Sequence, residues 1–195
     1  TLHMARLRRK KMSDDVELRA DARRNRERIL IAAEELFLER GVGVALEEIA
    51  KRAKVGIGTL YRRFPTREEL LAATSNERFL SVAETSRLRD AENDPNTAIR
   101  AYLEELAINT SIYQSFAASL GTVIECGTPG CNAITAEGNR LLRRAQEHGT
   151  VRPDVTFDDF ITVVTAISIA LEKKSSSKSR FAHLVDLFLH GIILR

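Results

Sequence analysis

Apolar and polar residues alternate along most of the chain with the three-to-four-residue spacing of amphipathic helices. Between residues 46 and 64 this pattern stops and then restarts. An apolar stripe runs up to Gly56, which interrupts it, and Leu60 and Phe64 resume it at helical spacing. We therefore predict two short helices joined by a turn. The stripe of the first helix consists of Leu46, Ile49, Ala50 and Ala53.

Longer helical patterns flank this pair. The segment from Arg24 to Glu39 carries an apolar face and is followed by Gly41, a residue that commonly ends helices. Downstream, Pro65 stops the second short helix, and Thr66 with Glu69 forms a capping box that begins a further helix to about Leu88. The sequence thus predicts a three-helix N-terminal head from which a long fourth helix leaves.

The rest of the chain is also predicted to be helical. We expect a fifth helix from 95 to about 113, a sixth to 125, a loop at 126–131, a seventh at 133–148, an eighth to about 171, a connector at 175–179 and a ninth at 181–194. The predicted fold is all-α, with about nine helices. We divide the chain into a basic arm at residues 1–20, a domain with the two short helices at 21–73, and a helical bundle at 74–195.

Net charge is distributed unevenly between the two ends of the chain. The net charge is +3 over 195 residues. Residues 1–67 hold 17 lysines and arginines against 10 acidic residues, a net +7, whereas 68–195 hold 13 against 17, a net −4. A basic head is what phosphate attraction requires. The basic run from Arg6 to Lys11 is interpreted either as an arm that follows DNA or as a solvated tail.

No secretory signal follows that basic run, and the longest apolar run, 160–171, is too short to cross a bilayer. We expect a cytoplasmic protein with no membrane partner.

The second short helix presents hydroxyl and guanidinium groups on its polar side, which suit phosphates and base edges.

The residues 24–73 resemble the TetR (tetracycline-repressor-like) family of bacterial transcription regulators. The resemblance rests on RNRERILIAAEELFLERG and LEEIAKRAKVGIGTLYRRFPTREELLAA, with G-T-L-Y-x-x-F-P as its most specific part. LLRRAQEHGTVRPDVTFDDF further resembles the C-terminal domain of the SbtR-like subgroup. The resemblance implies a homodimer that reads an operator and often binds a small effector. The chain departs from the family pattern at Val44-Ala45 and at Gly56, where Thr, Ser or Pro and then Ser are usual.

The candidate DNA contacts lie on and around the second short helix. The resemblance places Tyr61 against a phosphate, with Arg62 and Arg63 beside it, whereas Ile57 and Thr59 are better placed for base edges. The full predicted set is Arg24, Arg26, Lys51, Ile57, Gly58, Thr59, Leu60, Tyr61, Arg62, Arg63, Thr66 and Arg67.

The last two predicted helices are apolar around nearly their whole circumference, so each needs cover on two sides. A second copy of the chain would supply that cover, and a central place in a monomeric core is the alternative. The predicted dimer interface comprises Phe160, Val164, Ile167, Leu171, Leu184, Leu187, Phe188 and Ile192.

We expect a mostly apolar effector pocket within the bundle, although aromatic stripes at helical spacing are more often plain core. Asn109 needs a polar partner, which a ligand could be. The predicted lining is Phe79, Tyr102, Leu106, Asn109, Tyr113, Phe116, Thr162 and Thr165.

Alternatives for the effector role come from two residue groups. His183, Asp186 and His190 share a helical face at a possible metal-ligand spacing, and Cys126 and Cys131 could act as a redox sensor. No catalytic constellation is evident, so an enzyme or carrier with a vestigial head is the less favoured class, and we expect no cofactor. The sequence therefore favours a dimeric repressor in which an effector moves the fourth helix and weakens operator binding.

Overall fold

The computed structural model describes residues 2–90, 93–172 and 178–193. Within these ranges it contains nine α-helices, one short 3-10 helix and no strand beyond an isolated bridge between Val151 and Ile193, so the predicted all-α fold is confirmed. No helix in the described ranges is long and apolar enough to cross a membrane.

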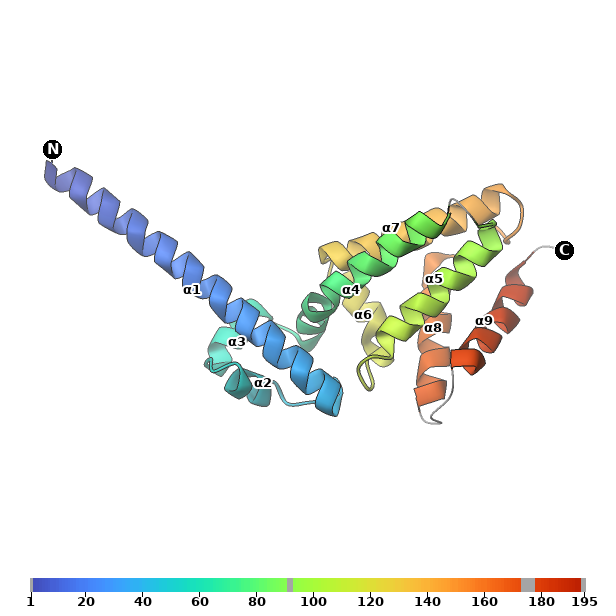
Figure 1. Ribbon diagram of the computed structural model, residues 1–195, viewed down its shortest axis with the longest axis horizontal. Coiled ribbons are helices and arrows are strands. Elements are labelled where there is room, and N and C mark those ends of the chain that lie inside the picture. The colour runs from blue at the N-terminus through green and yellow to red at the C-terminus, as the bar shows by residue number, and fades with distance from the viewer. Residues whose placement is uncertain (1, 91–92, 173–177, 194–195) are drawn as a thin grey trace.

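Three α-helices form the head, and six α-helices with one 3-10 helix form the body among the described residues (Figure 1). The head contains α1 (Leu2–Arg40), α2 (Leu46–Arg52) and α3 (Ile57–Arg63). The body contains α4 (Arg67–Asp90), α5 (Pro95–Thr110), η1 (Ala117–Ser119), α6 (Leu120–Glu125), α7 (Pro129–Glu147), α8 (Phe157–Glu172) and α9 (Lys178–Ile192).

The first helix is far longer than predicted. Residues 2–40 contain neither glycine nor proline, so nothing in the sequence breaks the helix before Gly41, whose φ of +77° ends it. The segment predicted as a separate basic arm at 1–20 is therefore helical from residue 2 and continuous with the head (Figure 1). The predicted boundary at 73/74 likewise falls inside a helix, α4.

Helix starts in the body follow the predicted caps. The backbone N–H of Glu69 donates to Thr66 Oγ1 at 3.1 Å, and Asp94 accepts from the backbone of Asn96 and Thr97. At the start of α8, Thr156 and Asp159 satisfy each other's backbone N–H groups, which completes the predicted capping box.

Two predicted boundaries are wrong. Helix α7 begins at Pro129 and not at 133, because the Thr128 side chain caps it and accepts from Cys131 N, so Cys131 lies in a helix and not in a loop. Helix α5 ends at Thr110, short of the predicted 113. Most of the predicted connector at 175–179 lies outside the described residues, and Ser179 belongs to α9.

A defined seam joins head and body. The rings of Phe37 and Tyr113 lie 5.5 Å apart, and the backbone N–H of Val42 donates to Gln114 O at 3.0 Å. A Cβ at Gly41 would lie 2.8 Å from that same carbonyl oxygen, so the chains approach as closely as only glycine allows. These five residues are called the seam below.

An ion pair and a cation–π contact reinforce the seam. The Arg78 guanidinium of α4 lies 2.9 Å from the Glu34 carboxylate of α1 and 4.6 Å from the centre of the Tyr113 ring. Burial raises the pKa of Tyr113 to about 12, so its hydroxyl stays protonated and donates to Glu34 at 3.4 Å. The head is thus tied to the body by packing, hydrogen bonds and charge.

Candidate nucleic-acid interface and ligand cavity

Helix α3 presents one buried and one exposed face. Leu60 and Phe64 are buried in the core of the head, whereas Ile57 and Tyr61 are 37% and 44% exposed. Arg62 and Arg63 are also exposed. The burial of two apolar anchors therefore fixes the side of the helix on which an aliphatic, a phenolic and two guanidinium groups face outward.

The start of α3 allows close approach by another molecule. Gly56 occupies the N-cap in an extended conformation, and a Cβ built at Gly58 would meet nothing within 4 Å. Thr59 is half-buried, and its Oγ1 accepts a hydrogen bond from Arg62 at 3.0 Å. This bond orients the hydroxyl and leaves its hydrogen free to be donated.

Two predicted DNA contacts are contradicted. Leu60 has no exposed surface, because it anchors α3 to the head. Arg67 turns inward and donates to the backbone oxygens of Val42 and Val44, both at 2.6 Å. Its guanidinium therefore holds the loop between α1 and α2, a structural role that its place after the recognition segment did not reveal.

The predicted contacts outside α3, apart from Arg67, are exposed. Arg26 of α1 lies over the ring of Phe64 at 5.7 Å from its centre, and Lys51 is exposed near the end of α2. Arg24 is exposed and forms an ion pair with Asp21. Thr66 is exposed while it caps α4. Lys54 was not among the predicted contacts. It is an exposed cation in the α2–α3 turn, with a φ of +55°, and a basic residue in that turn is visible in the sequence.

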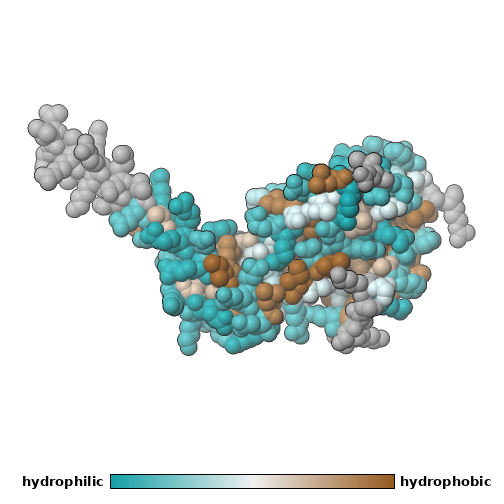
Figure 2. All heavy atoms as spheres, viewed as in Figure 1, coloured by the Kyte–Doolittle hydropathy of each residue, from teal (hydrophilic) through white to brown (hydrophobic). Residues whose placement is uncertain are grey.

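A cavity of about 660 Å³ lies beside the seam. It opens between the C-terminal ends of α1, α5 and α8, the 111–117 segment and the start of α9. Figure 2 shows hydrophobic surface where head and body meet, on a face that is otherwise largely hydrophilic. The cavity is lined by Leu38, Glu104, Ala107, Ile108, Thr110, Ser111, Ile112, Tyr113, Gln114, Ala117, Ser168, Leu171, Glu172 and Phe181.

The predicted pocket residues do not form this cavity, apart from Tyr113. Tyr102 is fully buried, and its hydroxyl donates its one hydrogen to Ile134 O at 2.7 Å. Asn109 finds its partner in Glu105 O at 2.9 Å. Thr165 is half-buried, and the exposed Thr162 lines a separate, smaller cavity. The other predicted residues are packed core: Phe79, Leu106 and Phe116.

The predicted dimer residues divide between interior and surface. Three of them are buried within the chain and fill the core of the body: Phe160, Val164 and Ile192. Leu187 is 58% exposed. Four are half-buried: Ile167, Leu171, Leu184 and Phe188. Of these, Leu171 lines the cavity. Leu187 of α9 is therefore the one residue of this predicted set that is largely exposed.

The groups considered for redox or metal sensing have other partners. Burial raises the pKa of both the Cys126 and the Cys131 thiols, which disfavours the reactive thiolate. Asp186 pairs with Arg100 of α5, and His190 Nδ1 lies 2.7 Å from Asp186 O. His183 is exposed. In the described residues no group of three His, Cys, Asp or Glu side chains is placed to hold a metal ion.

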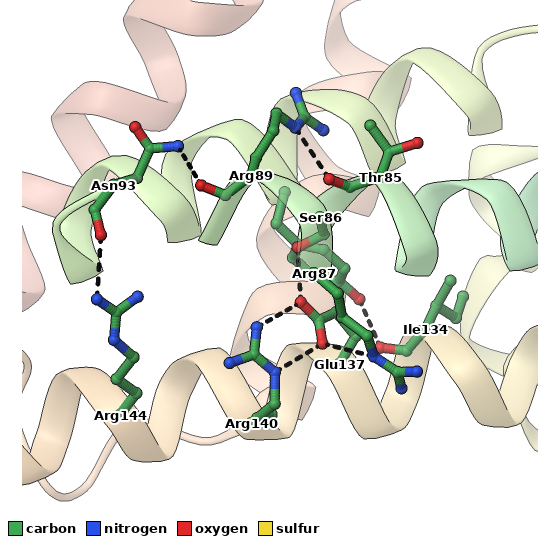
Figure 3. A network of polar contacts seen from close by, with 10 residues as sticks. Thr85, Ser86, Arg87, Arg89, Asn93, Ile134, Glu137, Arg140 and Arg144 are labelled. Carbon is green, nitrogen blue, oxygen red and sulfur yellow. Dashed lines mark hydrogen bonds and ion pairs between the residues drawn. The ribbon is translucent and has the colours of Figure 1, made fainter. Parts of the chain in front are cut away.

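A buried polar network clamps α4 to α7 (Figure 3). The Glu137 carboxylate of α7 has no exposed surface and accepts from Ser86 Oγ at 2.7 Å, from Arg87 at 3.2 Å and from Arg140 at 2.8 Å. Burial alone would raise the pKa of Glu137, but these hydrogen bonds outweigh it and hold the pKa below its usual value. The carboxylate therefore remains charged and fixed between the two helices.

Both ends of the same helix pair are also fixed. Gly130 N donates to the Asn76 side chain at 2.8 Å, and a Cβ at Gly130 would lie 2.4 Å from Asn76 O. At the far end, Arg144 donates to Asn93 O at 3.0 Å (Figure 3). Helix α4, which leaves the head, is therefore held to α7 by these contacts as well as by the Glu137 network.

The head presents a short helix with one exposed face, which a second short helix holds in place. The pair is mounted on an all-helical body that contains a cavity. This arrangement defines the class of helix-turn-helix transcriptional regulators. Residues 29–74 match the bacterial regulatory proteins of the tetR family, and residues 94–194 match the C-terminal domain of SbtR-like transcriptional regulators. The chain belongs to the TetR family.

Individual relatives agree with this assignment. Over 54 residues the chain is 44% identical to an HTH-type transcriptional regulator of Staphylococcus aureus (strain USA300), a match that covers 27% of this chain and 29% of the relative. It is 30% identical to the TetR regulator SCO0520 of Streptomyces coelicolor, with a TM-score of 0.53 over 86% of this chain and 98% of the other.

Other structures share the fold at lower identity. Thermus thermophilus FadR, a repressor solved with lauroyl-CoA, is 22% identical, with a TM-score of 0.62 over 87% of this chain and 96% of that one. RolR, solved with resorcinol, is also 22% identical, with a TM-score of 0.62 over 89% of each chain.

The Glu137 network predicts a pH-dependent contribution to stability. Glu137→Gln should lower the free energy of unfolding by about 2 kcal/mol at pH 7, because two partly exposed guanidinium groups lose their buried counter-charge. The lowered pKa means that the wild-type contribution is full above a pH of about 4.3 and disappears as the pH falls through the lower folded-state pKa.

Urea unfolding at pH 7 and near pH 3 would measure this difference. The gap between wild type and Glu137→Gln should shrink at the lower pH, and Glu147→Gln, at an exposed position near the end of α7, should match wild type at both. A gap that stays constant with pH would contradict the role given to the carboxylate.

Proposed function

We propose that the protein is a homodimeric, DNA-binding repressor that a small molecule releases from a palindromic operator. The observation that carries this proposal is the exposed face of α3, where Tyr61, Arg62 and Arg63 face outward from a helix anchored by Leu60 and Phe64. Phenol and guanidinium groups on a short, rigid helix suit the phosphates and base edges of a major groove.

Contacts along α3 divide by role. Tyr61 and Arg63 bind phosphates and set the position of the head, with Arg26 and Lys51 adding charge beside them. Ile57 and Thr59, at the N-terminal end of the helix, read base edges or thymine methyl groups. Lys54 in the preceding turn joins the phosphate contacts. Arg67 and Leu60 hold the head together and do not touch DNA.

The dimer forms through the outer sides of α8 and α9. Leu187 and Leu184 supply apolar surface on α9, while small or polar side chains at Thr162, Ala166 and Ala170 give α8 an outer side that a partner helix can approach closely. Two heads carried by such a dimer would reach half-sites about one helical turn apart, as helix-turn-helix dimers do.

The effector acts by shifting the population of head positions. FadR and RolR, which share this fold, were solved with lauroyl-CoA and with resorcinol, and the present chain has a cavity of about 660 Å³ beside the seam. Because α4 is clamped to α7, the two helices move as a unit, and the seam is where a ligand changes the angle of the head. The protein acts in the cytoplasm and uses no cofactor.

Substitutions on α3 test the proposed division of roles. Arg63→Ala should weaken binding to operator and scrambled duplexes alike and reduce the slope of log K against log salt by about two units, because each of the two copies in the dimer loses one phosphate contact. Thr59→Ala should cost about 1 to 3 kcal/mol on the operator alone, by relaxing preference at one base pair per half-site. Duplex titrations at several salt concentrations would measure both.

Arg143→Ala is the matched control, since it removes an exposed arginine from α7, remote from α3 in the chain. It should leave both affinities and the salt slope unchanged. If Thr59→Ala weakened both duplexes equally while Arg63→Ala altered base preference, the assigned roles would be reversed.

The dimer surface predicts the behaviour of a charge variant. Leu187→Glu should dissociate the dimer and strongly weaken operator binding, because a carboxylate buried without a partner costs several kcal/mol. Leu88→Glu makes the same change at an exposed leucine of α4 and should leave the dimer intact. Sedimentation would decide, and an unchanged dimer in Leu187→Glu would exclude this interface.

A further inference from the structure

We propose that the cavity beside the seam binds an amphipathic organic cation, such as an ammonium group carried on an aromatic or aliphatic body. The proposal deepens the effector part of the proposed function, and its effect on DNA rests on that function. The binding preference itself can be measured on the free protein. The proposal rests on three features of the cavity lining: its charge, its apolar surface and a hydroxyl without a hydrogen-bond partner among the described residues.

The charged side chains that line the cavity all have the same sign. Glu104 comes from α5 and Glu172 from the end of α8, and no lysine, arginine or histidine of the described residues lines the space. Arg100, the basic residue one turn before Glu104 on α5, is paired with Asp186. Among the described residues, a cation that entered would therefore meet two lining carboxylates and no lining guanidinium or ammonium group, an environment that favours a cation over an anion.

Glu172 is held in place for such a contact. One of its carboxylate oxygens accepts from the backbone N–H of Ser115, a residue with a φ of +65° in the segment that borders the cavity. A carboxylate can accept several hydrogen bonds, so its other oxygen can still receive an ammonium group. The backbone bond thus orients the charge before a ligand arrives, which lowers the entropy cost of binding.

The apolar part of the lining favours an amphipathic body over a small ion. Leu38, Ile108 and Ile112 border the cavity and keep much of their surface exposed, and Leu171 and Phe181 add to it. Covering such surface favours binding because it removes apolar area from water. A volume of about 660 Å³ lies within the range of sites for drug-sized molecules.

Ser168 provides independent support for a ligand in this cavity. It lines the cavity, is only 5% exposed, and its hydroxyl has no hydrogen-bond partner among the described residues. The neighbouring hydroxyls of Thr110 and Ser111 both donate to Ala107 O, at 3.0 and 2.8 Å. A buried hydroxyl without a partner is costly, and a ligand that hydrogen-bonds to Ser168 would remove that cost.

A ligand in this cavity contacts the residues that tie the head to the body. Tyr113 and Gln114 form part of the lining, and the same two residues contact Phe37, Gly41 and Val42 of the head. Leu38 of α1 also lines the cavity. Occupancy therefore changes the seam directly, without first separating α4 from α7.

Three probes with one skeleton and three charges test the proposal: 3,3-diphenylpropylamine, 3,3-diphenylpropan-1-ol and 3,3-diphenylpropanoate. Calorimetry at pH 7 on the full chain should show the protonated amine binding about tenfold more tightly than the alcohol, and the carboxylate most weakly. The combined variant Glu104→Gln, Glu172→Gln should remove the advantage of the amine over the alcohol, whereas Glu147→Gln should retain it.

Ser168→Ala separates hydrogen bonding from charge. It should weaken the amine and the alcohol alike, by about fivefold, while the protein remains folded. Equal affinities for the three probes, tighter binding of the carboxylate, no binding of any probe, or an unchanged amine preference in the double glutamine variant would overturn the proposal.

A DNA measurement keeps this proposal apart from the proposed function. If the protein binds an operator, saturating amine should weaken that complex about tenfold, and the double glutamine variant should respond much less. Failure to bind any duplex would contradict the proposed function and leave the measured ligand preference standing. Amine binding without an effect on DNA would overturn the effector role of the cavity.

Discussion

The packing of α3 against the head is the constraint on which the rest of the structure depends. The helix has seven residues, and a helix of that length is unstable alone in water. Its existence and its orientation both come from burial of Leu60 and Phe64 against α1 and α2. Because these two side chains face inward, Tyr61, Arg62 and Arg63 face outward, so the chemistry available to DNA is a consequence of the core.

A second level of order connects that head to the rest of the chain. The seam at Phe37 and Tyr113 fixes where the head sits, and the Glu137 network makes α4 and α7 one rigid pair (Figure 3). Regulation in such an arrangement needs no melting of the body. In the proposed mechanism a small change at the seam moves α3, because packed helices shift between discrete arrangements and do not deform continuously.

Local signals in the sequence predicted much of the fold. Caps at Thr66, Asp94 and Thr156 were readable because capping depends on residues only a few positions apart. The buried face of α3 was readable for the same reason. The capping of α7 by Thr128, followed by Pro129, was equally local and was overlooked because Gly127 and Gly130 made the segment look like a loop.

Features that depend on distant contacts could not be read in this way. Arg67 follows the recognition helix and has the composition of a DNA contact, yet carbonyl groups more than 20 residues earlier in the chain hold it. Tyr102 and Asn109 were predicted to line a pocket, but each donates to a carbonyl group of the protein itself, a partner that the helical spacing does not show. The cavity lies where the ends of four helices and one loop meet, and the periodicity of the sequence does not show which helix ends lie together.

The central claim is that two copies of α3, carried by one dimer, read a DNA site. Selection of bound duplexes from a random pool tests this claim most directly. The account predicts enrichment of a palindrome whose half-sites lie about one helical turn apart, centre to centre. No enrichment, or recovery of a single asymmetric site bound by one copy of the chain, would contradict it.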